Sequence, residues 1–445
     1  MKNRKFLYAL LWMGVSLSFL FSGCSKNAEE DGAAEGVAQP ESITETKEET
    51  EEKIYLEFYN RKREVYDIME QIISAFNQSQ DRIEVHQIMN TNAEVPLRIS
   101  AAKNDLPDII LMSGLQNTDT MEYIMGEYLL ELEDMECVER IREDYLPSLT
   151  YDGHIYQIPM ALGFEGIYVN RSLFASEGLE IPTTYEELCA VCEAIMDRGK
   201  TPFIFADTEG WTVHQNWECI QSVSTDDFSS IFTNVAENEC TFWEQEISRE
   251  SMQKLIELHQ YTNEENQELN YDEAMNRFAE DNAFMFMQGS WAYRNIIQQN
   301  PDLDLEMIPF PVEEGQEQYF TLWVDSSVGI AKNCEYPEEA KEFLEYLMQP
   351  EVLQMYLDEE DIIGCVEGAR IHAEYAPRIN QLIDSGQAKM DATWIPSPTS
   401  VIRDQDIAAL MPDASDGEIK DYMDVLTSSL RKHSQQFLAV KEKMG

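Results

Sequence analysis

Residues 151–188 read YDGHIYQIPMALGFEGIYVNRSLFASEGLEIPTTYEEL and hold the local signals that decide the fold. Asp152 and Gly153 form a turn signal. The alternation of apolar and polar residues that follows predicts a strand over 155–160. Because proline cannot donate a hydrogen bond to a sheet ladder, Pro159 should end this strand or place it at a sheet edge.

The same stretch continues with a chain crossing, a second strand and a capped helix. Gly163 and Gly166 permit backbone geometry that other residues resist, and the apolar run over 167–169 predicts a strand. A helix should begin after Thr184, because Glu187 stands three residues later and completes the pattern of a capping box.

The segment 54–112 alternates between strand and helix patterns. Its β-α-β-α-β order predicts an α/β fold with a mainly parallel sheet and helices on both faces. The expected elements are strands over 54–58, 83–88 and 108–112, and helices over 65–76 and 95–103. Later patterns predict strands over 203–205, 283–287 and 306–309, and helices near 217–222, after Pro337 and over 416–430.

Residues 151–188 resemble a signature of the extracellular solute-binding proteins of sugar-type ABC importers, in which DGK.YGVP precedes YYN..LF...G...P.TW.EL. His154 and Tyr185 stand where that family usually has Lys and Trp, and every glycine, proline and capping residue that the geometry needs is kept. Further motifs match in the expected order, so the resemblance covers about residues 54–435. They lie at Pro107-Asp108, 275–295, 307–311 and 328–347.

This resemblance implies a two-lobed, periplasmic-binding-protein-like fold of type II, with mixed, mainly parallel sheets and a ligand cleft between the lobes. It also implies that the chain crosses between the lobes more than once. Lobe one is expected over 54–162 and 326–370, and lobe two over 163–325 and 371–445.

The N-terminus is typical of an export signal. A basic start precedes a 16-residue apolar run, Phe6–Phe21, which is short for a membrane-spanning helix. The run ends before Cys24, as in bacterial lipoproteins, so residues 1–23 are expected to be cleaved and Cys24 lipidated. An ordinary signal peptide with an incidental cysteine is the alternative. The acidic segment 24–53 is expected to form a disordered tether.

The charge of the chain excludes some partners. With 84 acidic and 32 basic residues, the formal net charge is −52. Such a surface repels nucleic acid and anionic membranes, and it weakens the case for an anionic ligand. Solubility is the simplest reason for this charge, which does not identify the ligand.

Candidate ligand contacts follow the carboxyl ends of the expected strands, where open α/β sheets bind ligands. All six tryptophans after residue 24 lie beyond residue 210. Their flat rings could cover the C–H face of a sugar while carboxyl and amide groups bond its hydroxyls. The candidates are Tyr59, Asn60, Arg61, Met112, Ser113, Glu165, Trp211, Trp291, Trp323, Asp325 and Trp394.

Cys189 and Cys192 form a CxxC motif that invites a redox or metal interpretation. The motif lies within an expected helix among acidic residues, which oppose thiolate formation. Neither a second CxxC nor histidines at metal-ligand spacing complete a zinc site, so buried structural thiols are the preferred interpretation. We expect no metal and no cofactor.

The sequence therefore predicts a monomeric binding protein rather than an enzyme. By the resemblance, it captures a carbohydrate outside the cell, is held to the membrane by its lipid anchor, and delivers its ligand to the transmembrane permease subunits of an ABC importer. A secreted glycosidase and a surface carbohydrate adhesin are the alternatives. Common hydrolase and nucleotide-binding motifs do not occur in the sequence.

Overall fold

The computed structural model describes residues 53–62, 64–89, 94–262, 269–393, 395 and 414–444. All of them belong to one compact unit, Glu51–Gly445. The predicted signal peptide, Cys24, the tether up to residue 52 and Trp394 lie outside the described residues. In the described part of the chain, no helix combines the length and the apolar character needed to cross a bilayer.

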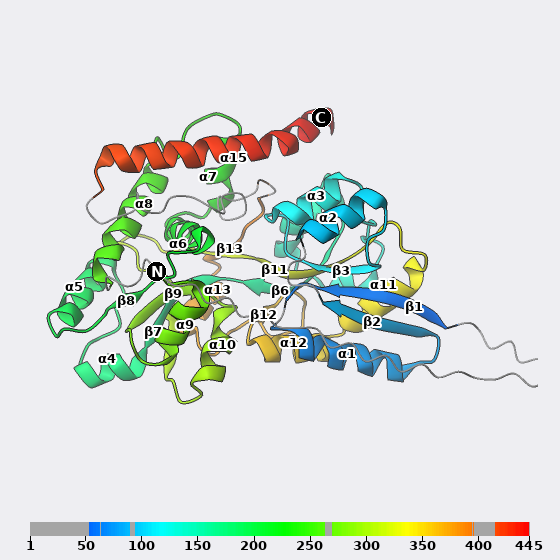
Figure 1. Ribbon diagram of the computed structural model, residues 1–445, viewed down its shortest axis with the longest axis horizontal. Coiled ribbons are helices and arrows are strands. Elements are labelled where there is room, and N and C mark those ends of the chain that lie inside the picture. The colour runs from blue at the N-terminus through cyan, green and yellow to red at the C-terminus, as the bar shows by residue number, and fades with distance from the viewer. Residues whose placement is uncertain are drawn as a thin grey trace, which may run out of the picture. The chain divides into compact units, whose positions relative to one another are not determined.

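The larger sheet has seven strands in the order β12-β6-β11-β3-β1-β2, with β13 paired to β11 (Figure 1). The first three strands are parallel and are joined through helices, which confirms the β-α-β-α-β prediction. The bounds are β1 Ile54–Asn60, α1 Tyr66–Ser79, β2 Ile83–Met89, α2 Glu94–Lys103, β3 Ile109–Met112, β6 Ile158–Gly163, β11 Phe320–Ile330, β12 Ile363–Gly364 and β13 Ala388–Met390.

Side chains alternate between the two faces of the sheet along each strand. Helices cover both faces of this sheet. Phe58 faces α1 and α11 (Pro337–Leu347), where its ring lies 6.0 Å from that of Phe343. Its neighbour Tyr59 belongs to a separate buried cluster with residues of α2 and α3 (Thr118–Met125). The helical spacing predicted for α1 is confirmed, since its apolar stripe is buried.

The larger sheet is mixed, as the resemblance implies, and the parallel pairing of β1, β2 and β3 does not continue to β11, β6 and β12. β11 pairs antiparallel with both β3 and β6, and β6 pairs antiparallel with β12. Antiparallel neighbours need no helical crossover between them. The long strand β11 can therefore join the sheet antiparallel to its neighbours although it comes from a distant part of the chain.

Pro159 lies near the start of β6 rather than at the end of the predicted strand. It pairs with Ser327 of β11, whereas β12 pairs with β6 only at Ala161 and Leu162, so among the described residues Pro159 has a strand neighbour on one side alone, as at a sheet edge. The register of β11 shifts between Ser326 and Ser327, and Pro159 is paired with Ser327 at this irregularity. A sheet tolerates proline where its hydrogen-bond ladder is already broken.

The second sheet has four strands in the order β10-β7-β9-β8, with antiparallel pairs except for β8 and β9. The chain enters it directly from β6 through Phe164, as predicted for the crossing. Its strands are β7 Glu165–Asn170, β8 Phe203–Ile204, β9 Met285–Gly289 and β10 Leu305–Ile308. The helices that follow these strands are α4 Arg171–Glu177, α5 Tyr185–Met196, α6 Gly210–Ser222, α7 Phe228–Ala236, α8 Glu246–Leu258, α9 Tyr271–Ala279 and α10 Ala292–Gln299.

The remaining elements complete the described chain (Figure 1). They are η1 Glu136–Arg140, η2 Glu143–Leu149, β4 Thr150–Tyr151, β5 His154–Ile155, η3 His259–Tyr261, α12 Pro350–Glu360, α13 Pro377–Asp384 and α15 Asp416–Met444. The capping box at α5 is confirmed, since Thr184 and Glu187 exchange the two expected bonds. The turn before β5 is confirmed by positive φ angles of 51° and 84° at Asp152 and Gly153.

The CxxC motif lies within α5, away from its first turn. Cys192 is buried and Cys189 is half-buried, and both thiols are free. Burial raises the pKa of both thiols, which opposes thiolate formation. These surroundings agree with the interpretation as structural thiols.

Candidate functional site

A recess lies beside one face of α6, where ends of β3 and β7 and the first half of β11 meet. Its empty volume is about 910 Å³, part of it open to solvent. Amides, hydroxyls, carboxyls and two aromatic rings make its wall. The lining residues are Ser113, Gln116, Asn117, Glu165, Gln215, Glu218, Cys219, Ser222, Phe228, Thr321, Trp323 and Asp391.

One part of the wall is the loop between β3 and α3. Ser113 follows β3 directly, and its hydroxyl accepts a hydrogen bond from Arg61. Gln116 Nε2 donates to the backbone oxygen of Val324 at 3.1 Å. Asn117 caps α3 by accepting from two backbone N–H groups. These bonds fix the polar side chains of the loop beside β11.

Glu165 is the first residue of β7 and is only 4% exposed, yet it lines the recess. With the Asn216 amide oriented to satisfy both of its groups, Nδ2 donates to Glu165 Oε1 at 2.9 Å and to Met287 O at 3.2 Å. Burial, and then the charge of Glu218, raise the pKa of Glu165 well above its usual value. A carboxyl that keeps its proton can donate a hydrogen bond to a ligand oxygen.

Asp391 follows β13 and supplies a second buried carboxyl. Burial raises its pKa to about 6, against the effect of two hydrogen bonds. Thr393 N and Ser229 Oγ both donate to Oδ1 at 2.9 Å. Within the described residues, Oδ2 is therefore the oxygen that a ligand hydroxyl could use.

Three half-buried indole rings form a continuous run from the recess. The ring of Trp323, which lines the recess, lies 6.2 Å from that of Trp291, and Trp291 lies 6.5 Å from Trp211. Glu209 orients Trp211 by accepting from its indole Nε1 at 2.6 Å and from Tyr271 N at 3.0 Å. The structure thus brings together three tryptophans that are far apart in the sequence.

Two glycines make room for these indoles. A Cβ atom on Gly163 would lie 2.6 Å from Trp323 Nε1. A Cβ atom on Gly289 would overlap the ring of Trp291. Close approach of the rings to the backbone, rather than backbone conformation, is what requires glycine at these two positions.

A buried ion pair fixes the loop between β8 and α6. Both ring nitrogens of His259 face acceptors, Leu255 O at 2.7 Å and Asp207 Oδ1 at 3.2 Å, so both carry a hydrogen and the ring is positively charged. Burial opposes this charge, but Asp207 outweighs it and raises the pKa of His259 above 6.5.

This pair predicts a pH dependence of stability. Because the pKa of His259 is higher in the folded than in the unfolded chain, its stabilisation is complete below the unfolded value and is lost as pH rises through the folded value. In thermal melts, the Tm difference between wild type and His259→Gln should be largest below about pH 6.5 and should shrink at higher pH. A difference that does not vary with pH would contradict a charged His259.

Asp325 was predicted to contact the ligand, but in the structure its carboxylate pairs with a lysine. Lys62 Nζ contacts Asp325 Oδ2 and donates to Ser326 Oγ at 2.8 Å. Both charged side chains are largely buried, 11% and 13% exposed. The sequence could not reveal this pair because its members are 263 residues apart. Asp325 does not line the recess.

Four other predicted contacts lie at the ends of β1 and β3 but do not line the recess. Tyr59 and Met112 are buried in the cluster beneath α2 and α3. Asn60 is buried and bonds Gln87 and the backbone of the following loop. Arg61 is not among the lining residues but donates a hydrogen bond to Ser113, which is. A position at a strand end does not decide which face of the sheet a side chain lies on. Here most of these side chains are buried in the core.

Several lining residues were missed by the sequence analysis. Gln215, Glu218 and Ser222 stand at helical spacing on one face of α6. That polar stripe beside Trp211 was a usable signal. Phe228 and Thr321 carried no such signal, and Asp391 follows β13, a short strand that the sequence analysis did not predict. Trp217, another of the six tryptophans, is fully buried in the core.

A family model described as bacterial extracellular solute-binding protein matches residues 71–377. The chain belongs to this family. This solute-binding protein is 25% identical, over 327 residues, to the multiple sugar-binding protein of Streptococcus mutans serotype c, a match that covers 72% of this chain and 77% of that protein. It is 22% identical, over 308 residues, to the melibiose/raffinose/stachyose-binding protein MelE of Bacillus subtilis, covering 64% and 67% of the two chains.

Solved structures confirm the two-lobed α/β fold for this solute-binding protein. The binding protein RafE in complex with raffinose has a TM-score of 0.73 at 20% identity, and the match covers 86% of this chain and all of that chain. A chitin oligosaccharide binding protein has a TM-score of 0.68 at 19% identity, covering 85% and 99%. The family and these relatives are binding proteins.

Proposed function

We propose that this solute-binding protein captures an uncharged oligosaccharide in the recess and delivers it to the permease subunits of an ABC importer. The observation that carries this proposal is the run of three indoles that ends in the recess beside buried carboxyls. Ring faces suit the C–H surface of a sugar, and convergent polar groups fix its orientation.

The polar groups of the recess suit hydroxyl ligands. Glu165 and Asp391 can each accept a hydrogen bond, and the raised pKa of Glu165 lets it donate one as well. Gln215 and Thr321 add an amide and a hydroxyl. Sugar hydroxyls both donate and accept, so they can satisfy all of these groups together.

Capture would proceed by closure of two lobes around the ligand. The proposed lobe one comprises 54–162 and 326–370, and lobe two comprises 163–325 and 371–445. One proposed crossing lies between Asp325 and Ser326, where the register of β11 shifts. A ligand that contacts both lobes only in the closed form shifts the population toward closure.

The proposed location is the outer face of a bacterial cell membrane. Lipidation of Cys24 after removal of residues 1–23 would anchor the chain, since two acyl chains bind a bilayer stably where one binds only marginally. The acidic segment up to Lys53 would serve as the tether, and the protein would act as a monomer.

A glycan panel tests this function. The protein is melted with mono- and oligosaccharides, amino acids, peptides and polyamines. We expect Tm to rise with oligosaccharides alone, because a ligand that binds only the folded state stabilises it. A rise with amino acids, peptides or polyamines and none with glycans would make the proposed ligand class wrong. Cleavage of a bound glycan during incubation would contradict a simple binding protein.

The glycine beneath Trp291 gives a more local prediction. Gly289→Ala should displace the Trp291 ring and weaken oligosaccharide binding by about tenfold, or ~1.4 kcal/mol, in a fluorescence titration. Gly417→Ala is the control, because the nearest atom to its new Cβ is 3.8 Å away. Equal affinities of the two variants would exclude Trp291 from the site.

A further inference from the structure

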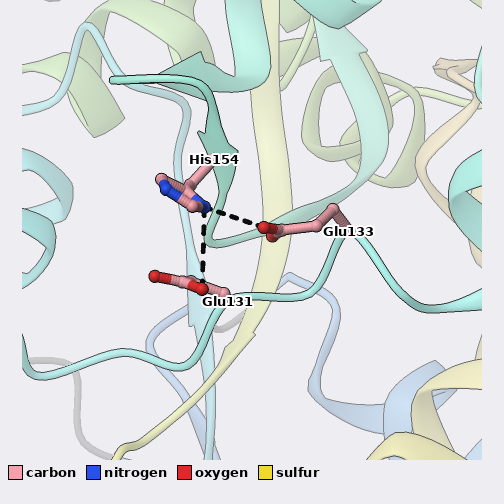
Figure 2. Close-up of side chains that lie close together, drawn as sticks. All are labelled: Glu131, Glu133 and His154. Carbon is pink, nitrogen blue, oxygen red and sulfur yellow. Dashed lines mark hydrogen bonds and ion pairs between the residues drawn. The ribbon is translucent and has the colours of Figure 1, made fainter.

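Outside the recess, three potential metal ligands meet beside the β4–β5 hairpin. Figure 2 shows the side chains of Glu131, Glu133 and His154 pointing toward one another. His154 Nδ1 lies 2.8 Å from Glu133 Oε1 and 3.6 Å from Glu131 Oε2. One ligand atom from each residue lies within 4.8 Å of the other two.

These separations fit the ligand shell of a small divalent cation. In a tetrahedral zinc site, bonds of about 2.0–2.1 Å place neighbouring ligand atoms about 3.3 Å apart. The two distances from His154 Nδ1, 2.8 and 3.6 Å, lie on either side of that value. Small side-chain adjustments would therefore admit a cation between the three groups. Imidazole with carboxylates suits zinc and its first-row neighbours better than calcium or magnesium.

The main chain holds the ligands in place. Leu132, between the two glutamates, is fully buried, so that Glu131 and Glu133 both turn outward. Leu132 N donates to Ile155 O at 2.7 Å, which fixes this segment against β5 and next to His154. The convergence of the three side chains thus follows from buried packing and a backbone hydrogen bond, not from their mutual contacts alone.

The local charge also favours a cation. Two carboxylates face a single imidazole, and no ion pair between either glutamate and a lysine or arginine occurs in the described part of the chain. His372 offers a comparison, because it is as exposed as His154 but faces one carboxylate, Asp384, at 2.8 Å. A divalent ion would offset the excess negative charge at the first cluster and not at the second.

We propose that Glu131, Glu133 and His154 form a binding site for a first-row divalent cation, with Zn²⁺ the best match and water completing the shell. The cation would tie the segment around Leu132 to the hairpin that precedes β6. This site is separate from the recess and does not depend on the ligand bound there.

Titration calorimetry of Zn²⁺ into the metal-free full chain tests the proposal. We expect one saturable site, weakened more than about tenfold by His154→Ala and by Glu131→Gln, the scale on which even outer-shell partners of a metal act. His372→Ala, the matched control, should bind as wild type does. Co²⁺ should give the visible absorption of a low-coordinate site in wild type and not in His154→Ala.

Each contrary result would overturn the proposal. Absence of a saturable site in wild type would do so, as would unchanged Zn²⁺ affinity in His154→Ala. Equal losses in His154→Ala and His372→Ala would show nonspecific surface binding instead. Melts of the metal-free variants should show that they are folded, because the replaced side chains are at least partly exposed.

Discussion

Replacing Trp323 by alanine should weaken oligosaccharide binding by about 30-fold, or ~2 kcal/mol, the scale of a tryptophan that dominates a binding surface. Trp323 is the indole that lines the recess, and its ring also supports Trp291. Removing the Trp323 ring therefore removes one stacking surface for the sugar and leaves the Trp291 ring without this support. Calorimetric titration with the best glycan of the panel measures the loss.

A matched control separates this effect from general damage. Trp243 is also partly buried, but it packs beside Arg249 and is not among the residues that line the recess. Trp243→Ala should lower Tm and keep the glycan affinity. If Trp323→Ala bound the glycan as wild type does, the recess would not be the binding site.

Replacing Lys62 by methionine should destabilise the protein by about 3–5 kcal/mol, because it leaves a buried carboxylate without its partner. Lys62 contacts Asp325, and the Coulombic influence of Lys62 also extends to Glu360. Burial raises the pKa of Glu360 to about 8 even with Lys62 present. Urea unfolding at neutral pH measures the change in unfolding free energy.

A double-mutant cycle identifies the cause of this loss. Lys62→Met combined with Asp325→Asn should be more stable than Lys62→Met alone, because the unpaired charge is gone. Strictly additive losses would mean that the two side chains do not interact in solution. The same cycle tests whether Asp325 has a structural role, as its contact with Lys62 indicates, or a role in ligand binding.

Local signals in the sequence predicted local structure well. The apolar stripe of α1, the capping box of Thr184 and Glu187, and the turn at Asp152 depend on neighbours within a few residues, and all are present. The fold class followed from the order of these elements and from family motifs. Pro159 was expected to end its strand and instead lies near the start of β6, where it pairs at a register shift in a strand more than 160 residues later.

The candidate site was harder to predict, because its residues meet only after folding. Ser113, Glu165 and Trp323 were found, since a strand end or a crossing marks each of them. Asp325 met the same criteria but pairs with a lysine that no spacing rule connects to it. Gln215 and the rest of the α6 face were missed because ligand contacts were sought at strand ends, at chain crossings and among the tryptophans, not along helices.

A crystal structure of the protein with the best glycan of the panel would show whether the recess binds the sugar. We expect one sugar ring against the face of Trp323, with hydroxyls within hydrogen-bond distance of Glu165 and Asp391. A glycan bound elsewhere on the protein, with the recess holding only water, would contradict it.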